Sequence, residues 1–466
     1  MSKKIKILMQ PSDTQGVGHF RTIWPAQSIQ KYHSDDFEVE IGTTTNFDDI
    51  EHLSQFDIIH FHRQMGDYAN FERLSSELRK RGVVVIMDID DYWEPASTHP
   101  LYEIVKKDGL TQKIINNLKH VDCVTTTTNI FKKEILKYNP FVHVIPNALD
   151  MTHKMWTSEV QENKTGKCRI TWIGGSSHHH DLLLLKDSFN KLNSSTKLKN
   201  KYQIIMCGFD VRGTVTEIRP DGSRNPRPIQ PHESVWNRFE EIFTSNYSLI
   251  ENKKYVKYLK SIKKDDSDGF ELENYVRRWT LPLTQYGKHY DYSDVCLAPL
   301  EETEMIKDEK GTISRRVNMF NYVKSELKII ESGMKKKALI AQDFGIYKEL
   351  LKDGETALLV SDNKKGWHKA IKDVILNPEL RERLADNLHN FVKDKYELKT
   401  VTDNRVEFYK QIMENKKAGK LKEFETQRCI LNGVFQKVET FGSGVVSESV
   451  LKEALLRAKE ESIQKK

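Results

Sequence analysis

The sequence has little of what marks several common protein classes. Its 466 residues contain only five cysteines, far apart and without a Cys-x-x-Cys pair, which argues against a disulfide framework or a zinc site. The 73 basic residues barely exceed the 67 acidic ones, and a net charge of +6 over this length neither requires nor excludes nucleic acid. The first apolar run is broken by Pro11 and Asp13, so it is too short for a signal peptide or a membrane span. We therefore expect a soluble, cytoplasmic protein without a transmembrane segment.

The composition that is present fits a folded chain with more than one domain. Hydrophobic residues make up 38% and charged residues 30%, as in ordinary globular proteins, and the length exceeds what one core usually serves. Short apolar runs alternate with helical patterns over residues 5–146, and the alternation starts again over residues 169–360. This order predicts an α/β fold with two tandem Rossmann-like, doubly wound domains that face a cleft.

The same rhythm sets the expected domain boundaries. We predict an N-terminal domain over residues 1–150 and a second domain over residues 151–400, with an insert at about 209–285 whose first part is rich in Gly, Pro and Arg and is expected to form a loop or small hairpin. A helix over residues 401–415 is expected to cross back to the first domain. Residues 416–466 form a charged extension that ends in a predicted helix. The sequence indicates neither the oligomeric state nor the role of this extension.

In the first half, two Gly residues follow the first predicted strand. Gly16 and Gly18 open a helix, where backbone N–H groups without an obstructing Cβ suit an anion, and Arg21 adds a cation. An ordinary tight turn explains the same pattern. The Gly-x-Gly-x-x-Gly motif is incomplete and no ribose-binding acid ends the second strand, so a nicotinamide-binding domain is disfavoured.

Acids and histidines follow the next predicted strands. His60 and His62 share one face of a strand, and "DIDDYW" (Asp88 to Trp93) follows the strand after it. Carboxylates in such a place are costly unless they bind cations, polar substrate groups or helix N-termini. Asp-x-Asp also suits a divalent metal or a phosphatase nucleophile, but no further acidic ligand and no matching phosphatase residue are present. We favour a base or hydroxyl-binding role and predict no metal.

In the second half, "WIGGSSHHHD" places Gly175 and Ser176 in a turn of the size that holds a phosphate. Three adjacent histidines cannot all face one way, so a tri-His metal site is not expected, whereas one of them, such as His180, suits a phosphate.

Further along, a charged helix is predicted to lead into a central strand. Asn321, Lys324, Lys328 and Glu331 follow at spacings of three, four and three residues, which is one helical face. A solvated face with ion pairs is one explanation of these charges. The other is a site in which lysines neutralise a diphosphate and Glu331 holds a ribose diol.

Taken in order, these motifs resemble the GT-B fold glycosyltransferases, most closely the retaining family 4 type, over roughly residues 3–410. The resemblance rests on six matches: the Gly16–Gly18 turn; the "DIIHFH" strand; the Ile145, Pro146, Asn147 and Asp150 set; the Lys328, Glu331 and Gly333 set before "ALIAQD"; the segment "YKELLKDGETALLV"; and the segment "LNPELRERLADN". It implies that Glu331 binds the donor ribose and that Lys324 and Lys328 lie near the diphosphate or donor sugar.

The sequence departs from that family at two places. The first Glu of the family's E-x7-E pair is Val323 here, and we expect Asn321 to replace it. The family's His-Asp pair is replaced by Asp88 to Asp91, so that Asp88 or Asp90 takes the place of the histidine.

The resulting prediction is a metal-independent, cofactor-free enzyme that transfers a hexose from a nucleotide-diphosphate sugar, with UDP as the expected nucleotide, to a hydroxyl acceptor with retention. The acceptor is a glycan or other biomolecule, or a hydroxymethylated base in DNA, because the first part of the insert carries Arg212, Arg219, Arg224 and Arg227. A nucleotide-sugar epimerase, or a nucleotide-sugar binding module without catalysis, would share this architecture. The predicted catalytic residues are Asp88, Asp90 and His62; the donor-binding residues are Gly16, Gly18, Gly175, Ser176, His180, Asn321, Lys324, Lys328 and Glu331; the acceptor-binding residues are Arg21, Asp91 and Trp93.

Overall fold

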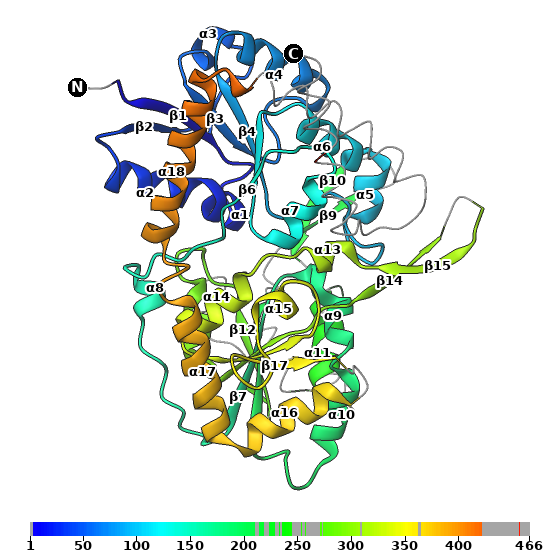
Figure 1. Ribbon diagram of the computed structural model, residues 1–466. Helices are drawn as coiled ribbons and strands as arrows, with labels where there is room; N and C mark the ends of the chain where they lie inside the picture. The colour runs from blue at the N-terminus through cyan, green and yellow to red at the C-terminus, as the bar shows by residue number, and fades with distance from the viewer. Residues whose placement is uncertain are drawn as a thin grey trace. The chain divides into compact units, whose positions relative to one another are not determined.

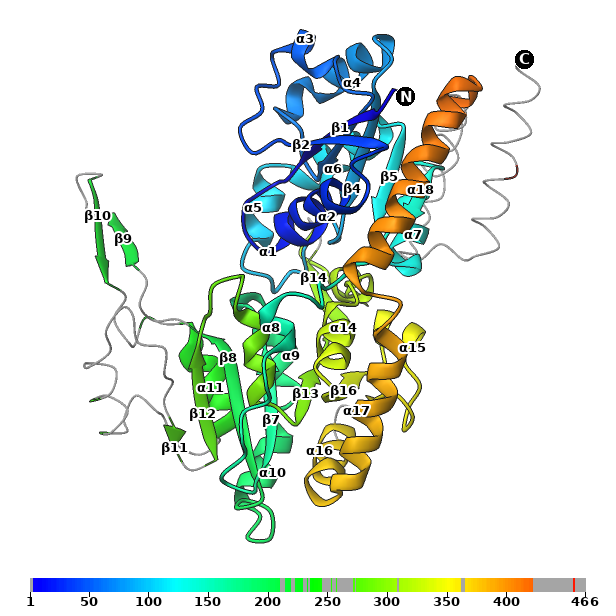
Figure 2. The same ribbon diagram turned by 90° about the vertical axis from the view of Figure 1, so that its left-hand side faces the viewer.

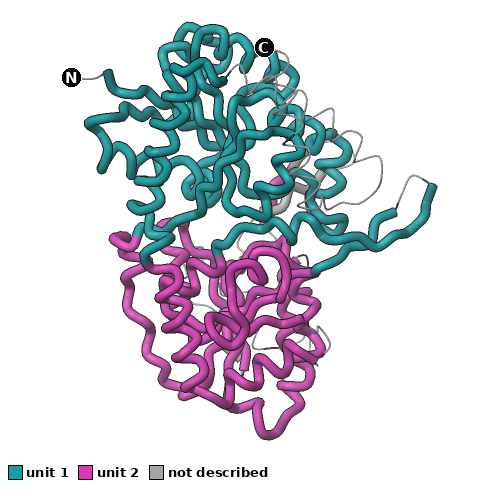
Figure 3. Tube along the Cα trace, in the orientation of Figure 1, with its two compact units in different colours: residues 1–150, 302–327, 394–466 teal, residues 151–301, 328–393 magenta. Residues whose placement is uncertain are grey.

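The computed structural model describes residues 3–209, 214–218, 223–228, 233, 235–244, 253, 257, 271–272, 274–307, 310–361, 365–421 and 456. These residues form two compact units (Figure 3). Unit 1 comprises residues 1–150, 302–327 and 394–466, and unit 2 comprises residues 151–301 and 328–393. The first boundary is where the sequence predicts it, but residues 302–327 pack with unit 1 and not with the second domain.

Unit 1 is built on a six-stranded parallel sheet with the order β2-β1-β3-β4-β5-β6. Its strands are β1 (Ile5–Gln10), β2 (Phe37–Ile41), β3 (Ile58–His62), β4 (Val84–Ile89), β5 (Cys123–Thr126) and β6 (Val142–Val144). Of the four central strands, β3, β4 and β5 are buried along their whole length, as parallel sheets covered by helices require, and their polar side chains lie mostly toward their carboxyl ends. The sequence prediction of a doubly wound domain is confirmed here.

Helices cover both faces of this sheet (Figures 1 and 2). One core joins the sheet to α2 and α18, and the other joins it to α4, α6 and α7. The helical segments of unit 1 are α1 (Gly16–Gly18), the π-helical η1 (His19–Ile23), α2 (Trp24–Tyr32), α3 (Ile50–Leu53), η2 (Tyr68–Asn70), α4 (Phe71–Lys80), α5 (Tyr102–Lys107), α6 (Leu110–Lys119), α7 (Asn129–Ile135), α13 (Met319–Tyr322) and α18 (Leu398–Lys417).

Unit 2 contains a seven-stranded sheet with the order β11-β12-β8-β7-β13-β16-β17, in which only β11 is antiparallel to its neighbour. Its strands are β7 (Cys168–Ile173), β8 (Tyr202–Phe209), β11 (Glu271–Leu272), β12 (Tyr275–Trp279), β13 (Val295–Ala298), β16 (Ala338–Gln342) and β17 (Leu358–Val360). Its helical segments are α8 (Lys154–Thr157), η3 (Ser176–His178), α9 (His179–Leu183), α10 (Lys186–Ser194), α11 (Trp236–Thr244), η6 (Tyr286–Tyr292), α14 (Leu327–Met334), α15 (Gly345–Leu350), α16 (Gly366–Leu376) and α17 (Pro378–Val392). Two tandem α/β units are therefore present, as predicted.

The prediction of one continuous charged helix after residue 318 is wrong. The segment is split into α13 and α14, with a non-helical link between them. The cause lies in the link, where Val323 is buried in a core of unit 1 and the Glu326 carboxylate accepts the Asn147 backbone N–H at 2.6 Å. These anchors stop a continuous helix, so Asn321 does not share a helical face with Glu331.

Two hairpins complete the described chain. β9 (Thr214–Ile218) and β10 (Arg224–Pro228) pair antiparallel within the predicted insert, in agreement with the expected loop or small hairpin. β14 (Thr303–Lys307) and β15 (Ile313–Val317) form the other, which belongs to unit 1. The helix predicted near the end of the charged extension lies outside the described residues except at residue 456. Among the residues that the structure describes, no helix combines the length and apolar character that crossing a bilayer demands.

Candidate functional site

The carboxyl edge of the unit 1 sheet holds a buried ion pair. Arg21, on the π-helical η1, donates from Nε to Asp88 Oδ2 at 2.9 Å and from Nη2 to Asp88 Oδ1 at 2.7 Å. Thr125 donates to Asp88 Oδ1 at 2.6 Å. Arg21 also donates to the Ile145 carbonyl at 2.9 Å and to the side chain of Asn147 at 3.2 Å. Both ends of the pair are thus hydrogen-bonded throughout, as a buried pair must be to offset desolvation.

Electrostatics keep Asp88 ionised inside the protein. Burial alone would raise its pKa, but the charge and hydrogen bonds of Arg21, with help from His62 and His60, lower the pKa to about 2. Asp88 and Arg21 are each 1% exposed. Asp88 and Arg21 are thus buried partners of each other, and the catalytic role predicted for Asp88 and the acceptor-binding role predicted for Arg21 stay predictions.

A second group of charged and polar side chains at this edge, around Asp90, lies closer to the surface. His62 Nε2 is 2.9 Å from Asp90 Oδ1, and its Nδ1 is 2.8 Å from Ser12 Oγ. Arg63 Nη2 donates to the same carboxylate oxygen, Asp90 Oδ1, at 3.3 Å. Burial opposes it, yet His62 and Arg63 together hold the pKa of Asp90 far below its usual value. His62 and Asp90, which lie 28 positions apart in the chain, are therefore brought together as one charged unit.

The backbone at this place is strained. The backbone of Arg63 has φ of 61°, a left-handed conformation that residues other than glycine rarely adopt. The Arg63 backbone N–H donates to the Asp88 carbonyl at 2.8 Å. Such strain costs about 1–3 kcal/mol and gathers at ligand-binding positions.

Of the two further acceptor candidates, one is near solvent and the other is in the core. About a third of the Asp91 side chain is exposed, and burial of the rest, together with the charge of Asp90, raises its pKa. Trp93 is 4% exposed and packs against Phe131 and Tyr138. Trp93 thus contributes to the core of unit 1, and its acceptor-binding role stays a prediction.

The Gly-rich turn of unit 1 is already occupied by a carboxylate. Asp13 Oδ1 accepts the backbone N–H groups of Gln15 at 2.8 Å and Gly18 at 3.2 Å. A Cβ on Gly18 would lie 1.8 Å from the Asp13 carbonyl oxygen, so only glycine fits there. Gly16 has open space around it. The anion at this turn is thus a side chain of the protein itself, and donor binding by Gly16 and Gly18 stays a prediction.

Unit 2 has an open Gly-rich turn at the same edge of its sheet. Gly175 and Ser176 are exposed after β7, and a Cβ on Gly175 would meet no atom within 4 Å. In the helical segment that follows this turn, His178 Nδ1 lies 2.8 Å from Asp181 Oδ2. Asp181 Oδ1 accepts the Glu301 backbone N–H at 2.7 Å. Burial lowers the pKa of the half-buried His180, which favours a neutral ring.

Glu331 lies on α14 in a set of donors that the sequence did not predict. Its Oε1 accepts Tyr286 Oη at 2.8 Å, and its Oε2 accepts both Tyr290 Oη at 2.5 Å and Lys328 Nζ at 2.8 Å. Glu331 is 3% exposed, while the Lys328 side chain is 30% exposed. Lys328 and Glu331 are thus brought together in unit 2 as predicted.

The other two residues of the predicted helical face lie in unit 1. Asn321 is buried, and its N–H is capped by the side chain of Asn318 at 3.1 Å. Lys324 is half-buried, with Nζ 4.8 Å from the Phe320 ring centre. Their place on a different unit follows from the break between α13 and α14.

Sequence reasoning missed three residues of these networks. Glu326 has no motif around it, although Asn147, its partner, belongs to the "IPNALD" segment that carries part of the family resemblance. Tyr286 and Tyr290 come from "QYGKHYDY", where the density of aromatic hydroxyls is the one signal in the sequence.

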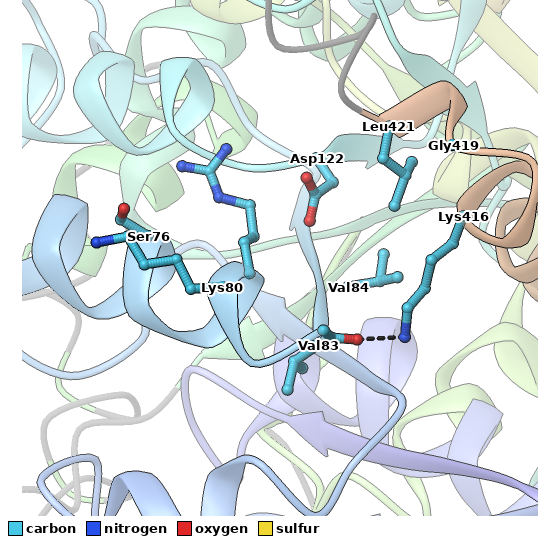
Figure 4. Close-up of a pocket in the computed structure, with 10 residues that line it drawn as sticks. Ser76, Lys80, Val83, Val84, Asp122, Lys416, Gly419 and Leu421 are labelled. Atoms are coloured by element: carbon cyan, nitrogen blue, oxygen red, sulfur yellow. Dashed lines mark hydrogen bonds between the residues drawn. The ribbon is translucent and has the colours of Figure 1, made fainter.

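Two further features of the described residues bear on ligand binding, namely possible metal ligands and a cavity in unit 1. Within the described ranges no three His, Cys, Asp or Glu side chains gather as a metal site. A cavity of about 390 Å³ lies at the opposite edge of the unit 1 sheet, between the ends of α4 and α18 (Figure 4). Its charged groups have internal partners, because Lys416 donates to the Gly82 carbonyl and Asp122 accepts the Val85 N–H.

Comparison with known proteins finds likeness in fold but not in sequence. No protein-family profile matches the chain, and no curated protein matches it in sequence. A sucrose-phosphate synthase from Thermosynechococcus elongatus is similar in structure, with a TM-score of 0.53, 11% identity, and coverage of 88% of this chain and 100% of the other. A glycosyltransferase from Rickettsia africae matches with a TM-score of 0.53 and 13% identity over 89% of this chain and 100% of its own. HepE from Anabaena, in complex with UDP and glucose, matches with a TM-score of 0.53 and 10% identity over 87% and 100%.

These matches extend across both units and agree with two parallel α/β sheets in tandem. The chain therefore has the GT-B glycosyltransferase fold.

Proposed function

We propose that this protein is a glycosyltransferase that moves a hexose from a nucleotide-diphosphate sugar, UDP-linked, to a hydroxyl acceptor, with retention as in the family 4 type. The observation that carries the proposal is the edge of the unit 2 sheet, where an exposed Gly-Ser turn and the Lys328–Glu331 pair occur on one GT-B domain. The structural match to HepE, which was solved with UDP and glucose, supports this choice of donor.

In this proposal unit 2 binds the donor. Gly175 and Ser176 offer backbone N–H groups without a side chain to block a phosphate, and Lys328 supplies a cation. Breaking the sugar–phosphate bond leaves new negative charge on the diphosphate, and placed donors stabilise such charge without needing to reorganise. Because these groups supply the positive charge, we propose that no divalent metal is required.

Unit 1 is proposed to bind the acceptor through Asp90 and Asp91. The His62–Asp90–Arg63 set keeps Asp90 ionised, so it accepts a hydrogen bond from an acceptor hydroxyl and orients it. With retention, the departing phosphate oxygen itself takes the hydroxyl proton, and no protein nucleophile is needed. Glycan acceptors are the main choice.

The experiment that tests the proposal is UDP release from a panel of UDP-sugars in EDTA, with a glycan panel or with hydroxymethylated DNA. Release stimulated by a glycan supports the proposal, and release stimulated by DNA keeps the transferase but changes the acceptor. Conversion of the sugar without transfer indicates an epimerase. Binding of UDP without turnover indicates a binding module, and no interaction with any nucleotide sugar contradicts the proposal.

The Asp90→Asn and Glu331→Ala variants separate acceptor orientation from donor binding. Asp90→Asn keeps the size of the side chain but removes the charge, so turnover should fall by about 10²-fold or more while UDP binding is unchanged. Glu331→Ala should instead weaken UDP binding. Steady-state kinetics and calorimetric titration of the two variants measure this difference, and equal behaviour would show that the assignment of donor and acceptor residues is wrong.

A further inference from the structure

The three donors to Glu331 leave its carboxylate only partly saturated. A carboxylate offers about four lone-pair positions, two on each oxygen. Oε2 is filled by Tyr290 and Lys328, whereas Oε1 has a single donor, Tyr286. Any further hydroxyl that binds Glu331 must therefore approach Oε1, where Tyr286 already sits.

The two tyrosines differ in access to solvent. Tyr290 is 1% exposed, and its hydroxyl also lies 3.4 Å from Lys328 Nζ, so it is enclosed. Tyr286 begins the η6 segment and is half-buried. Both rings lie against Trp156, with centroids 5.5 Å away for Tyr286 and 6.4 Å for Tyr290. Of the two tyrosine donors to this carboxylate, Tyr286 is thus the one that a ligand can reach and displace.

We propose that the Tyr286 hydroxyl is a placeholder on Glu331 Oε1 for a ribose hydroxyl of the bound nucleoside diphosphate, while Tyr290 and Lys328 hold the carboxylate in position. This inference rests on the proposed function and deepens it, since it assigns Tyr286 a role in selecting ribonucleotides. In the free protein the placeholder avoids a buried, under-bonded carboxylate oxygen, whose desolvation is costly. When the nucleotide binds, one hydroxyl replaces another at the same acceptor.

Both phenol hydroxyls stay protonated and can therefore donate hydrogen bonds to Glu331. Burial and the charge of Glu331 raise the pKa of both Tyr286 and Tyr290 well above the usual value. Both hydroxyls therefore keep their protons at neutral pH, and Glu331 remains the acceptor.

The test uses the full chain and two variants with opposite expected signs. Tyr286→Phe removes the competitor and should bind UDP about fivefold more tightly, because the ligand hydroxyl no longer displaces a hydrogen bond. Tyr290→Phe loosens the carboxylate and should bind UDP about fivefold more weakly. Tyr292→Phe on the same segment, whose ring lies 3.3 Å from the Arg278 guanidinium carbon, is the matched control and should bind like wild type.

A ligand control separates selection from general packing. With 2′,3′-dideoxy-UDP, which has no ribose hydroxyl to place, the gain in Tyr286→Phe should vanish. A gain that persists with the dideoxy ligand, or a Tyr286→Phe variant that binds UDP no better than wild type, overturns the placeholder and leaves the transferase proposal standing. If neither wild type nor Tyr286→Phe binds UDP, GDP or ADP, the proposed function and the placeholder both fail.

A second measurement needs no variant. In wild-type protein with ¹³Cζ-labelled tyrosine, addition of UDP should move the Tyr286 resonance, because its hydrogen-bond partner changes, and should leave that of Tyr290 nearly in place. A Tyr286 resonance unmoved by saturating UDP contradicts the inference even if Tyr286→Phe does not fold.

Discussion

The sheets of unit 1 and unit 2 share a parallel topology, yet the charged groups at their carboxyl edges are stabilised in different ways. In unit 1 each carboxylate contacts an arginine of the same unit, Asp88 with Arg21 and Asp90 with Arg63, and the His62 ring also bonds Asp90. In unit 2 Glu331 is held by two phenol hydroxyls and a single lysine. The Gly-rich turn is filled by Asp13 in unit 1 and is open in unit 2.

The difference shows how one architecture yields a closed edge and an open one. A buried ion pair needs both partners, since either charge alone is strongly unfavourable in the interior. A carboxylate held by neutral hydroxyls tolerates exchange of one of them for a ligand hydroxyl at small cost. We infer that the unit 1 edge fixes geometry, whereas the unit 2 edge accommodates a changing partner.

The largest predicted effect comes from breaking the buried pair. Arg21→Met leaves Asp88 charged and unpaired and should lower the free energy of unfolding by about 3–5 kcal/mol. Lys328→Met should cost about 1 kcal/mol, since Glu331 keeps both tyrosine donors. Urea unfolding of the two variants measures the contrast, and equal losses would show that the two edges are not stabilised differently.

A smaller effect is expected from Glu326, which is buried in unit 1 without a cation hydrogen-bonded to it. Burial raises its pKa from 4.5 to about 7, despite hydrogen bonds from backbone N–H groups and the nearby charges of Arg21 and Lys395. Between these values the folded protein binds a proton at Glu326 that the unfolded chain has released, so the contribution of Glu326 to stability falls as pH rises, by about 3 kcal/mol in total. Burial lowers the pKa of His60 and of His289 to about 3, and these two groups contribute in the opposite direction below about pH 6.5.

Glu326→Gln should remove this fall between pH 4.5 and 7. Denaturation curves of the variant and of the wild type across that range test the prediction as a difference between the two proteins, in which the contributions of His60 and His289 cancel. The Asp88 contribution is lost only below about pH 4, as its lowered pKa is approached. An unchanged slope in the variant would mean that other groups dominate this pH range.

The smallest predicted effects compare the two Gly-rich turns. Gly18→Ala forces a Cβ onto the Asp13 carbonyl and should destabilise the protein by about 1–3 kcal/mol. Gly175→Ala meets no neighbouring atom and should change stability by less than about 0.5 kcal/mol, but its methyl group should weaken UDP binding at the open turn. Thermal unfolding and calorimetric titration of both variants decide whether the turns differ as described.

Sequence reasoning found the fold because most strands of both sheets are continuous apolar runs. It missed β2, where Phe37, Val39 and Ile41 alternate with two glutamates along a sheet edge, and β12, where the buried Arg277 pairs with Glu240. It located the acid cluster of unit 1 and Glu331 of unit 2. Which cation serves which carboxylate was not predictable, because Arg21 and Asp88 are 67 positions apart and only the folded sheet joins them.

The position of α18 has a consequence for biosynthesis. Unit 1 needs this helix, since Tyr409 bonds His60 at 2.5 Å and, with Val406 and Ile412, covers one face of the central strands. A ribosome that makes about 5–20 residues per second delivers all of unit 2 before it delivers α18. The unit that begins first is therefore the unit that finishes last, and the part of its sheet face that α18 covers stays exposed in the nascent chain until residue 417 has emerged, although α2 is made early.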